Sequence, residues 1–329
     1  IIIMKICFLD NVTTPYTSND IYTNKIRGAE NVVINLSNEL SKLNHKVTIY
    51  NNCKKNTKID NINWKNINSI DDNPHFDLAI SNNDIRLFDK ISATKKVAIS
   101  HSIQSIEKFI RKGQLFSYMK HKPKIVLLGK YHKKNRNFFL RMFGSFQTSW
   151  AVDNIFLESE YKSVAINNQA IFTSFSDRNL NLLIKIWKEQ IYSTNNNFRL
   201  LVTPNNTNYI KYNIFNREFG DKSKMLSDIS ISRIFLIPGH KGELYCIAAE
   251  EARELCVPIV TLGIGCLKER VSHGKTGFVA KNEKEFADYT IQLFNDDIVW
   301  KNMKKNLLAL RGSKKWNDVA NQFLIKACE

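Results

Sequence analysis

Residues 233–261 read RIFLIPGHKGELYCIAAEEARELCVPIVT. The apolar run 233–238 predicts a buried β-strand, and the glycine-bearing loop after it leads into a predicted helix at 244–255. A second apolar run at 257–262 predicts the next strand. Strand, loop, helix and strand in this order are typical of a parallel sheet whose helices lie on its faces.

The same alternation extends in both directions from this stretch. In the first half, apolar residues three or four apart predict a helix at 30–43, between strands at 6–10 and 46–50. A second series follows an irregular stretch near 147–168. Further strands are expected at 77–81, 96–100, 124–128, 170–175, 198–202 and 277–280, and further helices at 180–192, 284–293, 297–310 and 316–327.

We therefore expect an α/β protein of two Rossmann-like, doubly wound domains that face a central cleft. The predicted boundaries are 1–150 for an acceptor-binding domain and 151–311 for a donor-binding domain. The C-terminal helix, at about 312–329, is a candidate to pack back on the first domain. Ligands of such sheets lie at the carboxyl ends of the strands, so the loops after strands are where chemistry is expected.

Composition excludes several classes of protein. The 329 residues are 43% hydrophobic, with no run of 18 apolar residues, so a globular core is expected and a membrane span is not. The opening nonapeptide, residues 1–9, resembles a first strand more than a signal peptide. Six scattered cysteines without a C-x-x-C pair argue against a zinc site and a disulfide framework. We expect a cytoplasmic protein that holds no metal or cofactor.

The net charge of +17 is unevenly distributed. No acidic residue occurs between Glu107 and Asp153, a stretch rich in Lys, Arg and aromatic residues. Such a block attracts lipid headgroups, nucleic acid or a phosphorylated substrate, although a lysine-rich composition alone could also produce it. Because no nucleic-acid-binding module is recognisable, we expect no nucleic-acid partner. Our hypothesis is peripheral contact with anionic membrane, at the inner face, where a lipid-linked acceptor would lie.

The loop 238–243 is a candidate anion site, because free backbone N–H groups and the positive end of the helix dipole point at a ligand there. Glu243 and Glu251 are eight residues apart. If Glu243 stands at the helix mouth, eight residues return Glu251 to nearly the same face. Two carboxylates so placed accept hydrogen bonds from a ligand rich in hydroxyl groups.

The whole run, in this order, resembles retaining glycosyltransferases of family 4, which are two-domain GT-B enzymes with a Glu-x7-Glu motif. Residues 28–47 resemble the first loop and helix of their acceptor domain. Residues 151–156 resemble the segment that leads into their donor domain. The segments that carry the resemblance in the last third are 233–238, Glu243 to Ala252, 257–261, Gly265, Glu269 and 274–278.

The resemblance implies roles for individual residues. Glu243 would contact hydroxyl groups of the donor sugar, and Glu251 the ribose hydroxyls of its nucleotide. Arg178 would neutralise the donor diphosphate, which leaves well only if its growing negative charge is met. His101, after the strand 96–100, would lie near the reacting centre. The remaining donor-binding residues are Lys241, Gly242, Gly265 and Gly28.

The sequence departs from the family pattern around the diphosphate. Leu244, Tyr245 and Cys246 stand where family members have glycine-rich residues, and Gly265-Cys266 replaces Gly-Gly. Family members typically have a second cation a few residues before the position matched by Arg178, but residues 173–175 of this sequence include no cation. Candidates to supply the missing charge are Lys241, Arg253 and Lys268.

The sequence thus predicts a glycosyltransferase that moves a hexose-type sugar from a nucleoside-diphosphate sugar to a glycan or lipid-linked acceptor. The resemblance implies retention of configuration and a role in cell-envelope glycan synthesis. One alternative is a catalytically decayed protein that only binds nucleotide sugars. A nucleic-acid-binding protein is the weaker alternative.

Overall fold

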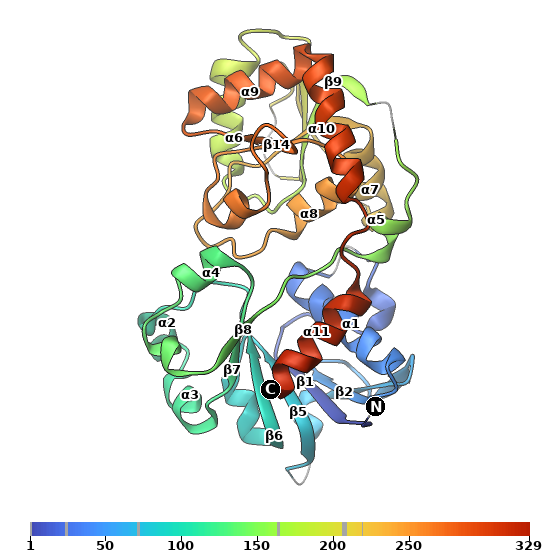
Figure 1. Ribbon diagram of the computed structural model, residues 1–329, viewed down its shortest axis with the longest axis vertical. Helices are drawn as coiled ribbons and strands as arrows, with labels where there is room; N and C mark the ends of the chain where they lie inside the picture. Colours follow the sequence, from blue (N-terminus) through green and yellow to red (C-terminus); the bar gives the residue numbers. More distant parts are fainter. Residues whose placement is uncertain (1, 24–25, 71–72, 163–164, 206–208, 219) are drawn as a thin grey trace. The chain divides into compact units, whose positions relative to one another are not determined.

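The computed structural model describes residues 2–23, 26–70, 73–162, 165–205, 209–218 and 220–329. The chain divides into two compact units (Figure 1). The first comprises Ile1–Ala151 and Lys315–Glu329, and the second comprises Val152–Lys314.

The first unit is built on an eight-stranded sheet in which neighbouring strands are parallel, except for the antiparallel pair β3 and β4. The chain moves outward from β1 to β2 and later returns beside β1 as β5, so the sheet is doubly wound about these two strands. In sheet order the strands are β3 (Thr57–Ile59), β4 (Ile62–Asn66), β2 (Lys46–Asn51), β1 (Lys5–Asp10), β5 (His75–Asn82), β6 (Ser92–Ile99), β7 (Lys124–Leu127) and β8 (Ser145–Gln147).

Short helices connect these strands. The predicted helix at 30–43 is present as α1 (Gly28–Lys42), whose apolar side is buried. The basic block, for which the sequence predicts only one strand, also forms short helices. The remaining elements are η1 (Ser18–Asp20), η2 (Ile67–Ser69), η3 (Ile85–Lys90), α2 (Ile106–Arg111), α3 (Leu115–His121), α4 (Lys130–Lys134) and η4 (Phe139–Met142).

The C-terminal helix α11 (Trp316–Cys328) belongs to the first unit. Figure 1 shows it beside α1, with which it is in contact. Trp316 stacks on Trp150 with ring centroids 6.0 Å apart. The Lys326 ammonium donates a hydrogen bond of 2.9 Å to the Gln147 carbonyl. Aromatic burial and these polar contacts hold the last helix on this sheet.

The second unit is built on six strands, all parallel. Both units are therefore α/β with doubly wound parallel sheets, as predicted; the cleft expected between them stays a prediction. In sheet order the strands are β11 (Ile214–Asn216), β10 (Arg199–Val202), β9 (Ile166–Phe172), β12 (Ser232–Leu236), β13 (Ile259–Thr261) and β14 (Gly277–Val279).

The predicted helices of the second unit are present, with differences in their bounds and with additional short elements. α7 and β11 were not expected, and α6 continues into a π-helical turn at Trp187–Ile191. The predicted helix at 244–255 begins three residues late. The helical elements are α5 (Asn154–Glu158), α6 (Leu180–Ile186), η6 (Ile210–Tyr212), α7 (Lys222–Ser230), α8 (Ile247–Glu254), η7 (Gly265–Glu269), α9 (Glu283–Asn295) and α10 (Asp297–Leu310).

The sequence predicts no membrane-spanning segment. Among the described residues, no helix has the length and apolar composition needed to cross a bilayer.

Candidate functional site

The second sheet reverses its winding between β9 and β12. The chain moves outward from β9 to β10 and β11, then returns beside β9 as β12 and continues to β13 and β14. Ligands of open parallel sheets bind at such a point, outside the carboxyl ends of the strands. The loops that leave β9, β12 and β13 carry Arg178, Glu243 and Gly265. The topology therefore collects three of the predicted residues at one edge of the sheet.

Arg178, His240 and Glu243 form a polar cluster at this edge, here called the Arg178 cluster. The Arg178 Nε lies 3.7 Å from Glu243 Oε2, and its Nη1 lies 3.3 Å from His240 Nδ1. The Gly242 N–H donates to the same Nδ1 at 3.0 Å. Since Nδ1 accepts hydrogen bonds, a neutral His240 carries its proton on Nε2.

The sequence alone indicates no partner for His240, yet the structure places it between Arg178 and the backbone of Gly242. Its position directly after a strand and a glycine was the available signal. The imidazole orients the guanidinium from one side while Glu243 contacts it from the other. The arrangement holds a cation at the edge of the sheet where ligands of open parallel sheets bind.

The Glu243 carboxyl is mostly buried, with 18% of its side chain exposed. Burial raises the pKa of this carboxyl, and the positive charge of Arg178 opposes the rise. Loss of Arg178 would leave the carboxylate with less compensation. The two side chains are therefore electrostatically coupled.

Two glycines allow the loops around the Arg178 cluster to pack closely against one another. Gly265 has φ of +73°, and a Cβ there would lie 2.4 Å from the His240 carbonyl oxygen and 3.0 Å from that of Glu243. At Gly242, a Cβ would lie 3.1 Å from the His240 ring and 3.6 Å from Arg178 Nη1. Side chains at these positions would press on the Arg178 cluster.

Replacing Gly265 by alanine is expected to reduce the free energy of unfolding more than Gly274→Ala. Both glycines have φ above +70°, and a non-glycine residue there costs about 1–2 kcal/mol. Only at position 265 does the new Cβ also collide with backbone oxygen, which adds about 1–3 kcal/mol. Urea unfolding of both variants measures the difference, and equal losses would contradict this account of the loop.

Glu251 does not share a helix face with Glu243, so that part of the sequence argument was wrong. α8 begins at Ile247 because Cys246 before it adopts a left-handed conformation, with φ of +58°. Glu243 therefore lies in the loop, outside the helix, and is placed by contacts with other loops. Glu251 lies in the second turn of α8.

Glu251 is buried beside Asp153, Arg217 and Lys222. Burial raises the pKa of its carboxyl to about 7; Asp153 adds to the rise, and Lys222 and Arg217 oppose it. The Lys222 ammonium is bonded to Asp153, and Arg217 Nε lies 2.9 Å from Asp228 Oδ2. No described residue makes a hydrogen bond to the Glu251 carboxyl. It is thus a buried carboxyl with capacity to accept hydrogen bonds from a ligand.

The three candidates for the missing second cation differ in their surroundings. Arg253 lies 3.1 Å from Glu250 and 2.6 Å from Glu254, so its charge is already neutralised and the suggestion is wrong for this residue. Lys268 packs beside Gly263, at the start of the loop that leads to Gly265. Lys241 is exposed and directly precedes Gly242. Lys241 and Lys268 remain candidates.

His101 and Gly28 belong to the first unit. The His101 Nε2 lies 2.9 Å from Asn82 Oδ1, and the Asn82 amide donates to Asp10 Oδ2 at 2.9 Å. Burial, together with the nearby His132, lowers the pKa of His101 to about 4. The imidazole is therefore neutral near pH 7 and donates its Nε2 proton to Asn82. Gly28 is the first residue of α1.

A cavity of about 590 Å³ lies where the first sheet reverses its winding, between β1 and β5. Asp10 and Asn82, the partners in the His101 network, line it together with Arg86 and Arg111. Burial raises the pKa of Asp10 to about 6, while Tyr16 and Asn82 oppose the rise through hydrogen bonds. Arg86 pairs with Asp84, another lining residue, at 2.7 Å, so the cavity combines the poorly acidic Asp10 carboxyl with the cation of Arg111.

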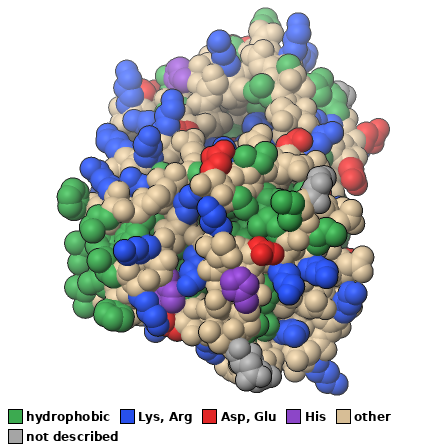
Figure 2. All heavy atoms as spheres, turned by 60° about the horizontal axis from the view of Figure 1, so that its bottom comes forward, with side chains coloured by type: hydrophobic (Ala, Val, Ile, Leu, Met, Phe, Trp, Pro, Cys, Tyr) green, Lys and Arg blue, Asp and Glu red, His purple; other side chains and the backbone are tan. Residues whose placement is uncertain are grey.

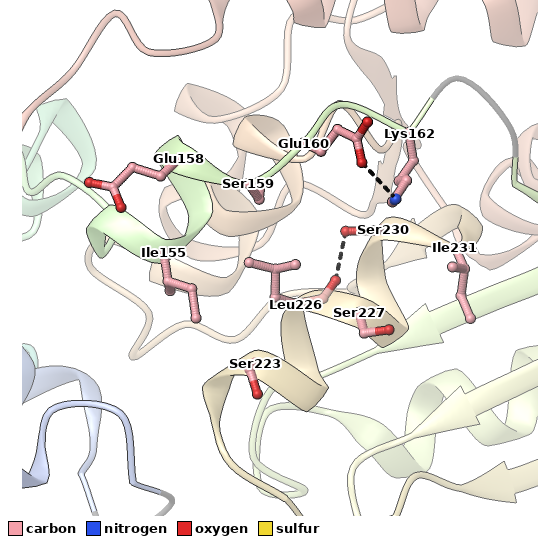
Figure 3. Close-up of a pocket in the computed structure, with 10 residues that line it drawn as sticks. All are labelled: Ile155, Glu158, Ser159, Glu160, Lys162, Ser223, Leu226, Ser227, Ser230 and Ile231. Atoms are coloured by element: carbon pink, nitrogen blue, oxygen red, sulfur yellow. Dashed lines mark hydrogen bonds and ion pairs between the residues drawn. The ribbon is translucent and has the colours of Figure 1, made fainter.

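A second cavity, of about 460 Å³, lies between α5 and α7 (Figure 3). None of the predicted site residues lines it. Lys162 pairs with Glu160 at 3.2 Å, and Ser230 Oγ donates to the Leu226 carbonyl at 2.7 Å (Figure 3).

Residues 174–308, less than half of the chain, match the family model of glycosyl transferases group 1. The match spans all loops of the Arg178 cluster. No curated protein sequence matches the chain.

Solved glycosyltransferase structures resemble the chain at low sequence identity. HepE of Anabaena in complex with UDP-glucose is 13% identical, covers 98% of this chain and 99% of its own, and has a TM-score of 0.70. WaaG, a glycosyltransferase involved in lipopolysaccharide biosynthesis, is 10% identical over 97% of this chain and 98% of its own, with a TM-score of 0.68.

TarM of S. aureus in complex with fondaparinux, alpha-GlcNAc-glycerol and UDP is 15% identical, with a TM-score of 0.61 over 77% of this chain. The chain spans only 55% of the length of TarM. At these identities the likeness establishes the fold. The protein therefore has the fold of GT-B glycosyltransferases, and its second unit contains the segment that matches glycosyl transferases group 1.

Proposed function

We propose that the protein is a glycosyltransferase that moves a hexose-type sugar from a nucleoside-diphosphate sugar to a glycan or lipid-linked acceptor, with retention of configuration. The observation that carries the proposal is the Arg178 cluster at the reversal between β9 and β12. A cation, a partly buried carboxyl and two closely packed glycine loops meet there. The group 1 family match over the same residues supports it.

In this proposal, Arg178 faces the donor diphosphate. Cleavage of the bond between the sugar and the diphosphate leaves negative charge on the departing phosphate, and a guanidinium held in place stabilises that charge as it forms. His240 and Glu243 keep the guanidinium oriented in the absence of donor. Lys241 or Lys268 supplies the second positive charge, and the backbone at Gly242 and Gly265 approaches the phosphates.

The two glutamates act on hydroxyl groups. Glu243 contacts the donor sugar, and Glu251 accepts hydrogen bonds from the ribose. A carboxyl with a pKa near 7 is partly protonated at neutral pH, so Glu251 gains most from a ligand that donates hydrogen bonds to its ionised form. Donor binding would therefore lower the pKa of Glu251.

The first unit binds the acceptor. Its cavity beside Asp10 and Asn82 contains Arg111, a cation that suits an acceptor with phosphate or another anionic group. His101 adjoins the cavity through Asn82 and serves as a neutral hydrogen-bonding group near the reacting centre, with Gly28 at the first loop. No metal held by the protein alone is invoked. We propose that the enzyme works in the cytoplasm, in cell-envelope glycan synthesis.

Release of free nucleoside diphosphate from a panel of sugar nucleotides tests the proposal. HepE binds UDP-glucose and TarM binds UDP in their solved complexes, so UDP-hexoses come first in the panel. We expect one donor to be turned over, and NMR of the product to show the donor's anomeric configuration. A product of opposite configuration would contradict retention but leave glycosyl transfer intact.

The decayed protein remains the second candidate because buried Leu244, Tyr245 and Cys246 occupy the loop where family members have glycines. It predicts that a sugar nucleotide raises the melting temperature without being turned over. Turnover with any acceptor excludes this alternative, whereas binding alone, across a broad acceptor panel, excludes the enzyme.

A further inference from the structure

Three neighbouring elements of the first unit expose large apolar side chains in pairs. In α2 and α3, two such residues lie four and three positions apart, which puts each pair on one side of its helix. The third pair lies at the ends of η4: one residue directly precedes this 3₁₀ turn and the other is its last residue. We call these six side chains the apolar surface. They are Ile106 (47% exposed) and Ile110 (63%), Phe116 (78%) and Met119 (43%), and Phe138 (77%) and Met142 (65%).

Local folding does not require the apolar surface, because other side chains of the same elements form the buried contacts. Phe109 and Tyr118 have ring centroids 4.9 Å apart, and Phe139 packs on Phe109 at 6.0 Å and on Phe143 at 5.3 Å. A surface helix of a soluble protein normally presents polar residues opposite such a core. Paired exposed apolar residues on three neighbouring elements therefore indicate an interaction surface.

Five of the six residues of the apolar surface lie within the acid-free block between Glu107 and Asp153, and Ile106 directly precedes Glu107. Arg111 follows Ile110 directly, Lys120 follows Met119, and Arg141 precedes Met142. Figure 2 shows hydrophobic side chains gathered at one side of this face, with Lys and Arg side chains around them. The exposed cations of the block are Arg111, Lys112, Lys120, Lys122, Lys130, Lys133, Lys134 and Arg141.

We propose that this surface binds an anionic lipid bilayer. The apolar pairs would enter the boundary between headgroups and acyl chains, while the cations remain at the level of the phosphates. Nucleic acid would use the cations and stack on aromatic rings, but it offers no environment for exposed isoleucine and methionine. Both the charge and the aliphatic character of the surface therefore favour a membrane.

The cavity beside β1 and β5 adjoins this surface, since Ile110 and Arg111 belong to both. A lipid-linked acceptor held in the bilayer would thus present its headgroup beside the cavity. This consequence rests on the proposed function, whereas membrane binding itself does not. Membrane binding and glycosyl transfer can therefore be refuted separately, because a protein without transferase activity can still bind vesicles.

Co-sedimentation with phosphatidylcholine vesicles, with and without phosphatidylglycerol, tests the proposal on the full chain. We expect strong binding only with phosphatidylglycerol. Arg111→Glu with Arg141→Glu should weaken partitioning by at least about 25-fold, because each basic residue near an anionic surface contributes about fivefold. Phe116→Ser with Phe138→Ser should weaken it at least about tenfold. The matched control is Ile298→Ser on α10, a side chain that is 75% exposed, which should change nothing.

Tryptophan fluorescence reports where the surface lies. Phe116→Trp should shift its emission to the blue when phosphatidylglycerol vesicles are added, and Ile298→Trp should not. Binding that ignores phosphatidylglycerol, or that the Phe116 and Phe138 substitutions leave unchanged, would overturn the proposal. Binding to RNA or DNA that only the charge reversals weaken, without vesicle binding, would replace it by a nucleic-acid surface.

Discussion

Arg178→Ala is expected to lower kcat/KM for glycosyl transfer by about 10²–10³-fold, the usual effect of removing one preorganised group that stabilises developing charge. Arg178 lies 3.7 Å from Glu243 and 3.3 Å from His240, so its guanidinium is already oriented before donor binds. The substitution also leaves the Glu243 carboxyl without its nearest cation. Steady-state kinetics with the donor identified by the panel measures the loss.

Two variants separate this role from a general effect of charge. Arg178→Lys should recover part of the activity, because a cation remains but its planar fork is lost. Lys185→Ala should be silent, since that residue lies on α6 and pairs with Glu283 at 3.0 Å, outside the Arg178 cluster. The double variant Arg178→Ala/Glu243→Gln should lose less than the sum of the single variants, because the two groups interact. Unchanged activity of Arg178→Ala would refute the assignment.

Glu251→Gln is expected to stabilise the ligand-free protein at pH 8 by about 3 kcal/mol while weakening donor binding. The pKa of Glu251 is raised from 4.5 to about 7, and each unit corresponds to about 1.4 kcal/mol. Because the pKa of Glu251 is raised in the folded state, its protonated carboxyl stabilises the fold below pH 4.5. This contribution is lost as the pH rises towards 7. The gain from glutamine should therefore shrink as the pH is lowered from 8 to 5.

The neighbouring Glu250 is a matched control with the opposite sign. Burial favours its protonated form, but Lys314, Arg253 and Arg270 outweigh burial and lower the pKa of this carboxyl. Its contribution to stability is present above pH 4.5 and is lost as the pH falls through the lowered value. Glu250→Gln should therefore destabilise the protein at pH 8, by about 3 kcal/mol or more. Urea unfolding at pH 8 and pH 5 measures both variants, and destabilisation by Glu251→Gln at pH 8 would contradict the assignment.

Much of the architecture could be predicted because its signals are local. Apolar runs of four to six residues mark the central strands, and the spacing of Val33, Leu36 and Leu40 marks α1. Short edge strands such as β8 and β11 have three residues each and no such signal. They form because backbone groups pair with a neighbouring strand that lies far away in sequence.

The sequence allowed several residues of the candidate site to be selected, but not their positions relative to one another. The order of motifs in the sequence selected Glu243, Glu251 and Arg178 and pointed to a sugar-nucleotide ligand. A helix expected to start at residue 244 placed the two glutamates on one face, whereas the left-handed Cys246 delays α8 and leaves Glu243 in the loop. His240 and Asp153 became visible only through contacts with Arg178 and Glu251.

The sequence by itself determined the α/β class, the doubly wound sheets and the region of residues 233–278 as the candidate sugar-nucleotide site. Only the tertiary structure decided which groups meet at the reversal between β9 and β12, and that Glu251 is buried beside Asp153. Strand and helix propensities depend on residues close in sequence. Distances between charged groups, and the pKa values that follow from them, depend on burial among segments that are distant in sequence.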